Sequence, residues 1–92
     1  MGNLQALLYE IDGTKSALIL GPDGEIGNFK VLRRVSVGES PRALLRTKDA
    51  IGLVLDGNAT LPIIKAAEKR GCKFIVAKNF TTTSRSVNLI SF

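Results

Sequence analysis

The chain has 92 residues, of which 45% are hydrophobic, and thirteen Lys and Arg against eight Asp and Glu give it a formal net charge of +5. This length fits one small domain and excludes a large enzyme core. The sequence has no histidine and a single cysteine, Cys72, which excludes imidazole acid/base chemistry, a Cys/His zinc site and an internal disulfide. It lacks both a signal-peptide pattern and an apolar run of about 20 residues, so we expect a single cytoplasmic domain.

The charge is unevenly distributed along the chain. Residues 1–28 contain one base, Lys15, against four acids, whereas residues 29–92 contain twelve bases against four acids. A positive field of this kind favours phosphate backbones or acidic protein surfaces as partners. The few aromatic residues, 5% of the chain, argue against reading single strands by base stacking.

The N-terminal segment predicts a short amphipathic helix. Asn3 is a good N-cap, Asp12-Gly13 is a good terminator, and apolar residues recur between them at the i, i+3, i+4, i+7 spacing, at Leu4, Leu7, Leu8 and Ile11. This apolar stripe is typical of a helix packed on a core, and a partner surface is the alternative.

A hairpin is expected next. The apolar run at 14–20 predicts a central strand, and Gly21-Pro22-Asp23-Gly24 is a turn signal. In the second strand, 26–37, apolar residues alternate with bases, which predicts one polar face and a position at the edge of the sheet.

Ser40-Pro41 predicts an N-cap and a first helical turn, so we expect a short helix at 41–47. Arg42 and Arg46 are four residues apart and share one helix face. A basic patch is one interpretation and a solvated helix face is the other. The candidate members of the patch are Lys30, Arg33, Arg34, Arg42, Arg46 and Arg85.

Residues 50–79 have the pattern of a βαβ unit. An apolar run at 50–55 and a second at 73–77 flank a 3.6-residue periodicity at 60–70, with Thr60 as N-cap and Gly71 as the left-handed C-terminal residue. A connection this short makes the two strands parallel, with a right-handed crossover. With a last strand at 86–92, the sequence predicts an α/β fold, a small mixed sheet of about five strands with flanking helices.

Both parallel strands end at one edge of the sheet, where open α/β sheets bind ligands. The candidate rim residues are Asp56, Gly57, Asn58, Thr60 and Lys78. A plain strand-to-helix turn is the alternative interpretation of Asp56-Gly57-Asn58. The hydroxyl-rich loop that follows, Thr81-Thr82-Thr83-Ser84, is either a phosphate-holding loop or a plain connection.

Three motifs in this order resemble the C-terminal domain of the archaeal DnaG-type primase. They are Gly13-Thr14-Lys15-Ser16-Ala17, Val54-Leu55-Asp56-Gly57 followed by Thr60 and an aliphatic helix, and Gly71-Cys72-Lys73-Phe74-Ile75-Val76-Ala77. The resemblance covers residues 4–92 and implies that the chain is the C-terminal fragment of a longer protein. It also implies a TOPRIM-like or Rossmann-like shape.

In that family a catalytic TOPRIM module lies upstream of this piece. The full-length protein looks like a magnesium-dependent, primer-synthesising nucleotidyltransferase and is also associated with the archaeal RNA exosome. A TOPRIM site needs a glutamate after one strand and an Asp-x-Asp pair after another to hold magnesium against phosphates. Here Asp56 is followed two residues later by Asn58, and the first strand ends without a glutamate. We therefore expect this domain to have no catalytic residues, metal or cofactor of its own.

Three functions follow as hypotheses. The first is a non-catalytic docking domain for a protein such as an exosome subunit or a replication partner. The second is an accessory domain that binds RNA or DNA backbones through its bases. The third is a small-molecule or nucleotide site at the Asp56, Thr60 and Lys78 rim, and the absence of a Gly-rich phosphate loop weakens this hypothesis.

Overall fold

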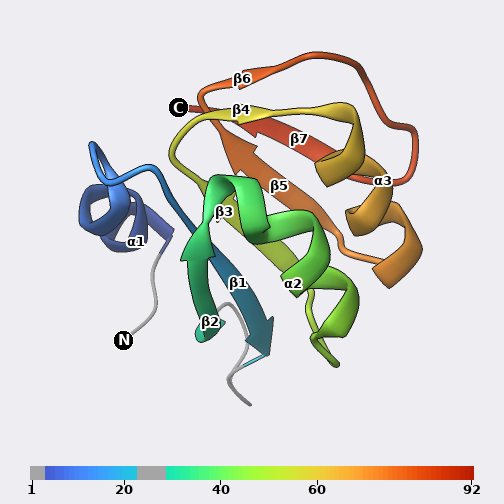
Figure 1. The fold of residues 1–92 in the computed structure, drawn as a ribbon, viewed down its shortest axis with the longest axis horizontal. Helices are drawn as coiled ribbons and strands as arrows, with labels where there is room; N and C mark the ends of the chain where they lie inside the picture. The colour runs from blue at the N-terminus through green and yellow to red at the C-terminus, as the bar shows by residue number, and fades with distance from the viewer. Residues whose placement is uncertain (1–3, 23–28) are drawn as a thin grey trace.

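A computed structural model of the protein describes residues 4–22 and 29–92 (Figure 1). The main sheet has five strands in the order β2-β1-β3-β5-β7. Their bounds are β1 Ser16–Pro22, β2 Phe29–Ser36, β3 Gly52–Leu55, β5 Phe74–Ala77 and β7 Asn88–Ser91. Strands β3, β5 and β7 are parallel, whereas β1 is antiparallel to both of its neighbours. The predicted mixed sheet, its hairpin and its parallel βαβ unit are confirmed.

The described residues form three α-helices that flank this sheet: α1 (Leu4–Ile11), α2 (Ser40–Arg46), which follows a 3-10 turn at Val37–Glu39, and α3 (Leu61–Arg70). Helices α2 and α3 lie side by side over one face, as Figure 1 shows. Helix α1 packs on the other face through Leu7 and Ile11, which cluster with Leu18, Leu20, Val54 and Val76. We call these the α2/α3 face and the α1 face.

The three inner strands are buried on both faces because nearly every side chain is apolar. Alternate residues of β1 and β3, such as Ile19 and Leu53, join the larger cluster under α2 and α3. Their neighbours Leu18 and Val54 join the smaller cluster under α1. Alternation along a strand sends successive side chains to opposite faces, so an unbroken apolar run serves two layers.

Strand β2 is an edge strand, as predicted, but its alternation is interrupted. Ile19 pairs with Arg33 and Leu20 pairs with Val31, so Leu32 is an extra residue in a β-bulge. The bulge places Leu32 against the α2/α3 cluster and leaves Val31 exposed. The simple alternation expected for 26–37 is therefore wrong at this point. The part of that expectation that covers residues 26–28 lies outside the described residues, as do the Asn3 cap and residues 23 and 24 of the predicted turn.

The start of α2 also differs from the prediction. Ser40 is not the N-cap: it is the first helical residue, it is buried, and its hydroxyl donates to the Val37 carbonyl at 2.6 Å. Glu39 holds the cap position without a side-chain cap hydrogen bond. The preceding 3-10 turn already positions the first turn of α2, so the cap function of the hydroxyl is not needed.

Helix α3 follows the prediction closely. Thr60 occupies the N-cap position, although its side chain makes no cap hydrogen bond, and Gly71 ends the helix in the left-handed region with φ 70°. The amide of Gly71 donates to the Glu68 carbonyl and that of Cys72 to the Ala67 carbonyl. These two hydrogen bonds end the helix and turn the chain toward β5, which begins at Phe74.

Candidate functional site

Four separate segments meet at the carboxyl edge of the parallel strands. Strand β1 runs antiparallel to β3, so its start lies beside the end of β3. This brings the 12–15 turn next to Asp56, which follows β3. Lys78 follows β5 and Phe92 follows β7 at the same edge. Residues far apart in sequence therefore form one cluster, and its central groups are Asp12, Asp56 and Lys78.

Asp56 is the buried anchor of this cluster, with only 5% of its side chain exposed. Its Oδ1 lies 2.7 Å from Nζ of Lys78, and its Oδ2 accepts the backbone N–H of Lys15 at 2.8 Å. The hydrogen bond from Lys78, followed by that from Lys15, holds the pKa of the Asp56 carboxyl below its ordinary value despite burial. Asp56 is thus a charged carboxylate whose two oxygens are already bound.

The 12–15 turn has an uncommon backbone that serves this carboxylate. Gly13 has φ 81° and Lys15 has φ 55°, which is unfavourable for a residue with a side chain. This conformation directs the Lys15 amide toward Asp56, while the Lys15 carbonyl accepts the Val37 amide at 3.1 Å. The turn therefore links the end of β3 to the end of β2.

Lys78 lies between two carboxylates. Its Nζ is 2.7 Å from Asp56 and 2.9 Å from Oδ1 of Asp12, and it stands 5.9 Å from the centre of the Phe92 ring. The hydrogen bond to Asp56, and then the one to Asp12, raises the pKa of the Lys78 ammonium. The Lys78 ammonium thus occupies the space between the two carboxylates that a bound metal ion would need. In residues 4–22 and 29–92 no group of three or more His, Cys, Asp or Glu side chains is arranged to hold a metal ion.

Among the remaining rim residues, Asn58 belongs to a second, very small sheet. Asn58–Ala59 (β4) pairs in parallel with Asn79–Phe80 (β6), and the Lys78 amide donates to the Gly57 carbonyl at 3.0 Å. The side chains of Asn58, Thr60 and Asn79 are exposed. This pairing, which we call the β4–β6 clasp, joins the backbones of the two loops that follow β3 and β5, next to the ion pair between the buried Asp56 and the partly exposed Lys78.

The hydroxyl-rich loop uses two of its side chains internally. Ser84 donates to Oε2 of Glu68 on α3 at 2.6 Å and accepts the Val87 amide at 3.2 Å. The Thr81 amide and hydroxyl both donate to the Ala59 carbonyl. These bonds favour the interpretation of 81–84 as a connection fastened to the α3 side of the domain.

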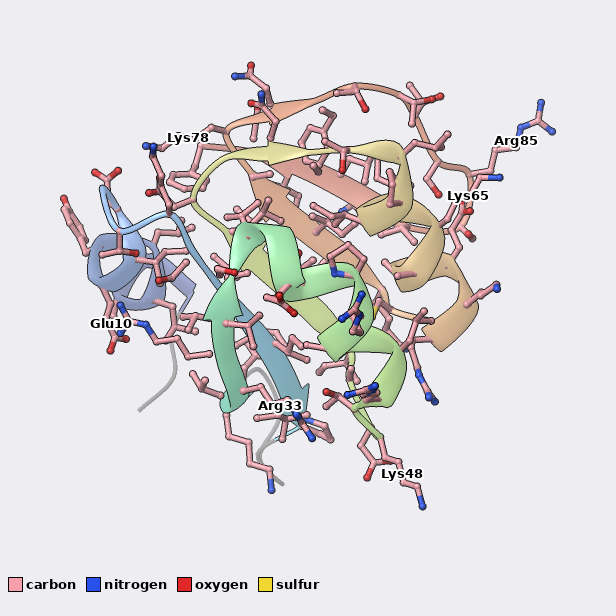
Figure 2. All side chains as sticks on the ribbon, in the orientation of Figure 1. Glu10, Arg33, Lys48, Lys65, Lys78 and Arg85 are labelled. Carbon is pink, nitrogen blue, oxygen red and sulfur yellow. The ribbon has the colours of Figure 1, made fainter. Side chains whose placement is uncertain are left out.

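The candidate basic residues do not share one face. Arg34 pairs with Leu18 of the α1-face cluster, and its guanidinium lies 4.0 Å from Glu10. Arg33 pairs with Ile19 and so faces the α2/α3 side, and Lys30 pairs with Gly21. Arg42 and Arg46 are exposed on α2, and Arg85 projects from the loop before β7 on another flank (Figure 2).

Figure 2 also shows bases that are not among those candidates, such as Lys48 and Lys65, on the side of α2 and α3. Arg70 belongs to this layer in a structural role. Its guanidinium donates to the Leu45 carbonyl through Nε at 3.0 Å and through Nη2, which ties the end of α3 to α2. The acids Glu10, Asp12 and Asp56 lie toward the α1 side, where each is close to a base, Arg34 or Lys78.

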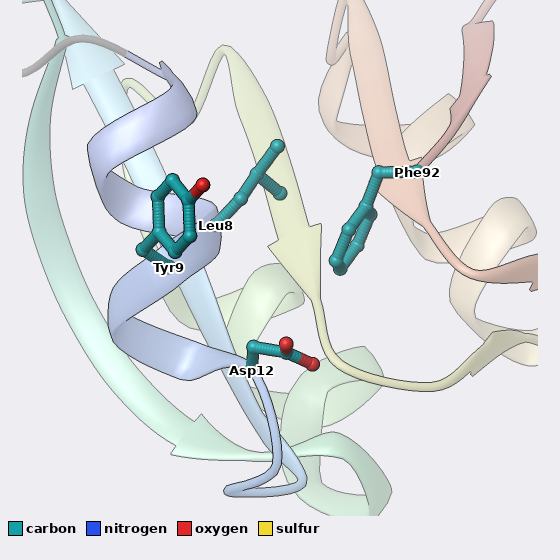
Figure 3. Close-up of a pocket in the computed structure, with 4 residues that line it drawn as sticks. All are labelled: Leu8, Tyr9, Asp12 and Phe92. Atoms are coloured by element: carbon teal, nitrogen blue, oxygen red, sulfur yellow. The ribbon is translucent and has the colours of Figure 1, made fainter.

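A shallow hollow of about 230 Å³ lies between α1 and the end of β7. Figure 3 shows Leu8 and Phe92 pointing toward each other across it, with Tyr9 on α1 and Asp12 at the end next to Lys78. Tyr9 is 78% exposed and Phe92 is 41% exposed. The hollow is mostly apolar, open to solvent and bordered by a charged group, which suits a protein side chain better than a charged metabolite.

Sequence reasoning did not identify Asp12, Lys15 or Phe92 as site residues. Asp12 has the signature of a helix terminator, and it does follow α1. Phe92 was predicted as the last strand residue, but it lies just after β7 and only its amide bond to Ala77 continues the pairing with β5. Their convergence depends on β1 being antiparallel to β3. The detectable signal was the turn before β1, since the antiparallel pairing of neighbouring strands places such a turn at the carboxyl rim.

Cys72 is buried, and its thiol donates to the Ala50 carbonyl at 3.7 Å. Burial raises the pKa of the thiol to about 11, so it remains protonated near neutral pH. This agrees with its interpretation as a packed core residue and not a nucleophile.

Comparison with protein-family models, with curated proteins and with solved structures gives no match to this chain. Within the described part of the chain, each helix is too short or too polar to cross a membrane.

Proposed function

We propose that the chain is a non-catalytic, cytoplasmic docking domain, as its resemblance to the C-terminal domain of the archaeal DnaG-type primase implies. Its role is to join a longer primase-like protein to a protein partner, and the archaeal RNA exosome is the first candidate. The observation that carries the proposal is the incomplete cover of the α1 face. Helix α1 packs over β1 and β3, whereas Ile90 and Phe92 of the outer β7 segment remain 37% and 41% exposed.

The closed charge cluster supports the non-catalytic part of this proposal. A catalytic carboxylate must be free to bind a metal or to move a proton. Asp56 instead has one oxygen on Lys78 and the other on the Lys15 amide. Releasing it would leave the buried Asp56 carboxylate without its partner Lys78, which is costly in a small domain. The cluster is better suited to fixing the shape of the rim.

The hollow supports the docking part. Leu8, Tyr9 and Phe92 present apolar surface that this domain does not cover, and Asp12 supplies an acceptor beside it. The partner chemistry that fits is an apolar anchor side chain flanked by a hydrogen-bond donor. Burial of an aromatic or aliphatic anchor in such a site typically dominates the affinity of a small interface.

The experiment measures binding of the purified domain to purified archaeal exosome by calorimetry, with nuclease present, at about 50 mM and about 200 mM salt. The variant Tyr9→Ser/Phe92→Ser should weaken binding at least about tenfold, which corresponds to about 1.4 kcal/mol. A matched control is Leu61→Ser, because Leu61 is 49% exposed on α3, over the opposite face. Equal binding by the double variant and the control, or no binding by the wild type at either salt, would contradict the proposal.

A second candidate is the accessory nucleic-acid domain, and one observation favours it. The layer of α2 and α3 carries Arg42, Arg46, Lys65 and Lys69 on exposed positions. Phosphate binding by such bases falls steeply as salt rises, and an apolar contact does not. Loss of RNA binding in Arg42→Glu/Arg46→Glu, together with wild-type binding that disappears at about 200 mM salt, would favour this function instead.

A further inference from the structure

The two edge strands of the sheet differ in how they are protected. Strand β2 has a bulge at Leu32 and carries Lys30, Arg33 and Arg34. Bulges and bases are the devices by which edge strands avoid pairing with other chains. Residues 86–92, which contain β7, have no charged residue, no proline and no glycine, and β7 pairs with β5 without a register shift. The β7 edge has the features of a strand that accepts a partner.

The backbone groups available at this edge follow from the pairing with β5. Asn88 donates its amide to the Lys73 carbonyl at 3.0 Å, and Phe92 donates to the Ala77 carbonyl at 3.1 Å. Successive residues of a strand point their backbone groups to opposite sides, so those of Leu89 and Ser91 point away from β5. Among the described residues, β7 pairs with β5 alone in the main sheet.

The loop that precedes β7 does not take up these groups. Its Ser84 hydroxyl is bound to Glu68 on α3 and its Thr81 amide to the Ala59 carbonyl. Both bonds hold the loop on the α3 side of the domain. Asn88, Ile90 and Ser91 remain exposed.

We propose that the β7 edge pairs with the β7 edge of a second copy of this chain, antiparallel about a two-fold axis at Ile90. In this register Leu89 and Ser91 face each other across the axis and exchange both N–H···O bonds, which gives four hydrogen bonds in all. Ile90 then lies opposite its own counterpart in the non-hydrogen-bonded position, where the side chains are closest. Phe92 faces Asn88 of the second copy on the same side of the sheet.

The uncharged, partly apolar side chains of β7 argue for a second copy as the occupant, because two copies can pair at this edge without bringing their bases together. Each copy has a net charge of +5, so most approaches bring bases together. Symmetric pairing through β2 would place Lys30, Arg33 and Arg34 beside the same residues of the partner. Symmetric pairing through β7 brings together only uncharged side chains, and two of these, Ile90 and Phe92, are exposed and apolar. The resulting isologous contact joins two five-stranded sheets into one.

Sedimentation equilibrium of the purified domain between about 10 μM and 1 mM tests this, because a small interface of this kind binds in the micromolar to millimolar range. The wild type should shift from monomer to dimer. Ser91→Pro removes an outward amide without affecting the bonds to β5, and it should weaken the dimer at least tenfold. Ser91→Ala is the matched control and should dimerise normally.

A second pair of variants tests the axis. Ile90→Lys places two like charges opposite each other and should abolish the dimer, whereas Val31→Lys changes an equally exposed residue of β2 and should not. In amide exchange, Leu89 and Ser91 should become protected as concentration rises, and Ile90 should be protected throughout. A monomer up to 1 mM, or a dimer that survives both Ser91→Pro and Ile90→Lys, would overturn the inference. Because no other protein is present, this outcome is independent of exosome binding.

Discussion

The two faces of the sheet are covered to different extents. The α2/α3 face buries one continuous cluster that runs from Ala17 and Ile19 through Leu44 and Ile64 to Val87. The α1 face buries a smaller cluster and leaves Tyr9, Ile90 and Phe92 exposed. In a domain of this size one well-packed face must supply most of the stability. The other face is then free to carry surface for a partner, and this division can be tested residue by residue.

The largest effect should come from the α2/α3 face. Ile64 is 1% exposed within the main cluster, and Ile64→Ala should lower the free energy of unfolding by about 2–5 kcal/mol, because it removes buried methyl groups and leaves a cavity. Denaturant unfolding followed by circular dichroism measures this. Tyr9→Ala on the α1 face should stay within about 0.5 kcal/mol of the wild type. Similar losses for the two variants would remove the distinction between the faces.

The next prediction concerns the part of the α1 face that α1 does not cover, where the Phe74 ring packs over Gly52. Gly52 pairs with Phe74, and a Cβ built on Gly52 would lie 2.2 Å from the Phe74 ring. The same ring contacts Phe29, with centroids 5.2 Å apart and planes tilted by 59°. Gly52→Ala should therefore displace the ring and cost about 1–3 kcal/mol.

Thermal unfolding of Gly52→Ala, compared with the double variant Gly52→Ala/Phe74→Leu, measures that strain. The smaller side chain should recover part of the loss, because it no longer occupies the space above Gly52. If the double variant is as unstable as the sum of the two single variants, Phe74 does not require a glycine at position 52.

A smaller effect concerns the carboxyl rim. In Asp56→Asn, an amide N–H₂ group or a neutral oxygen replaces the charge that faces Lys78, so we expect a loss of about 1–2 kcal/mol at pH 7 with the fold retained. The folded-state pKa of Asp56 is lowered, so its contribution is complete above the unfolded carboxyl pKa and disappears as the pH falls through the folded value.

The difference in stability between wild type and Asp56→Asn should therefore be constant from pH 7 to about pH 5 and shrink toward zero near pH 2. Chemical denaturation at a series of pH values measures it. Asp12→Asn is the matched control, since Asp12 also contacts Lys78 but is exposed, and it should cost less than about 0.5 kcal/mol. A pH-independent difference would mean that the ion pair is not the source of the effect.

The smallest expected effect is an increase in stability. Lys15 has φ 55°, which glycine adopts without strain, so Lys15→Gly should stabilise the domain by up to about 1 kcal/mol while keeping the amide hydrogen bond to Asp56. Lys15→Ala keeps the strain and should show no gain. A matching gain in Lys15→Ala, measured by thermal unfolding, would instead assign the effect to the lost side-chain charge.

Sequence patterns were sufficient for the architecture because the inner strands are continuous apolar runs and the α3 segment has clear end signals in Pro62 and Gly71. They did not predict the β-bulge at Leu32, because a bulge depends on the pairing register between two strands and not on the sequence of one strand alone. They failed at Ser40 because a preceding 3-10 turn replaced the cap.

The candidate site was predicted in part. Asp56 and Lys78 follow strands whose parallel pairing was predictable, so their meeting at one edge follows from the βαβ unit alone. Asp12, Lys15 and Phe92 reach the same edge through β1 and β7, whose places in the sheet are set by tertiary packing. The predicted basic patch does not lie on one face, because Arg33 and Arg34 are neighbours on a strand and point to opposite faces of the sheet.

The small β4–β6 clasp has a consequence for how the domain tolerates changes in length. It fixes one end of the connection to β7 through the Thr81–Ala59 bonds, and Ser84 fixes the other through Glu68. Thr82 and Thr83 lie between these anchors. Extra residues inserted there would extend a loop whose ends stay in place, and each doubling of such a loop costs only about 0.6 kcal/mol. The segment is therefore a suitable point for attaching a peptide tag or a whole second domain without disturbing the sheet.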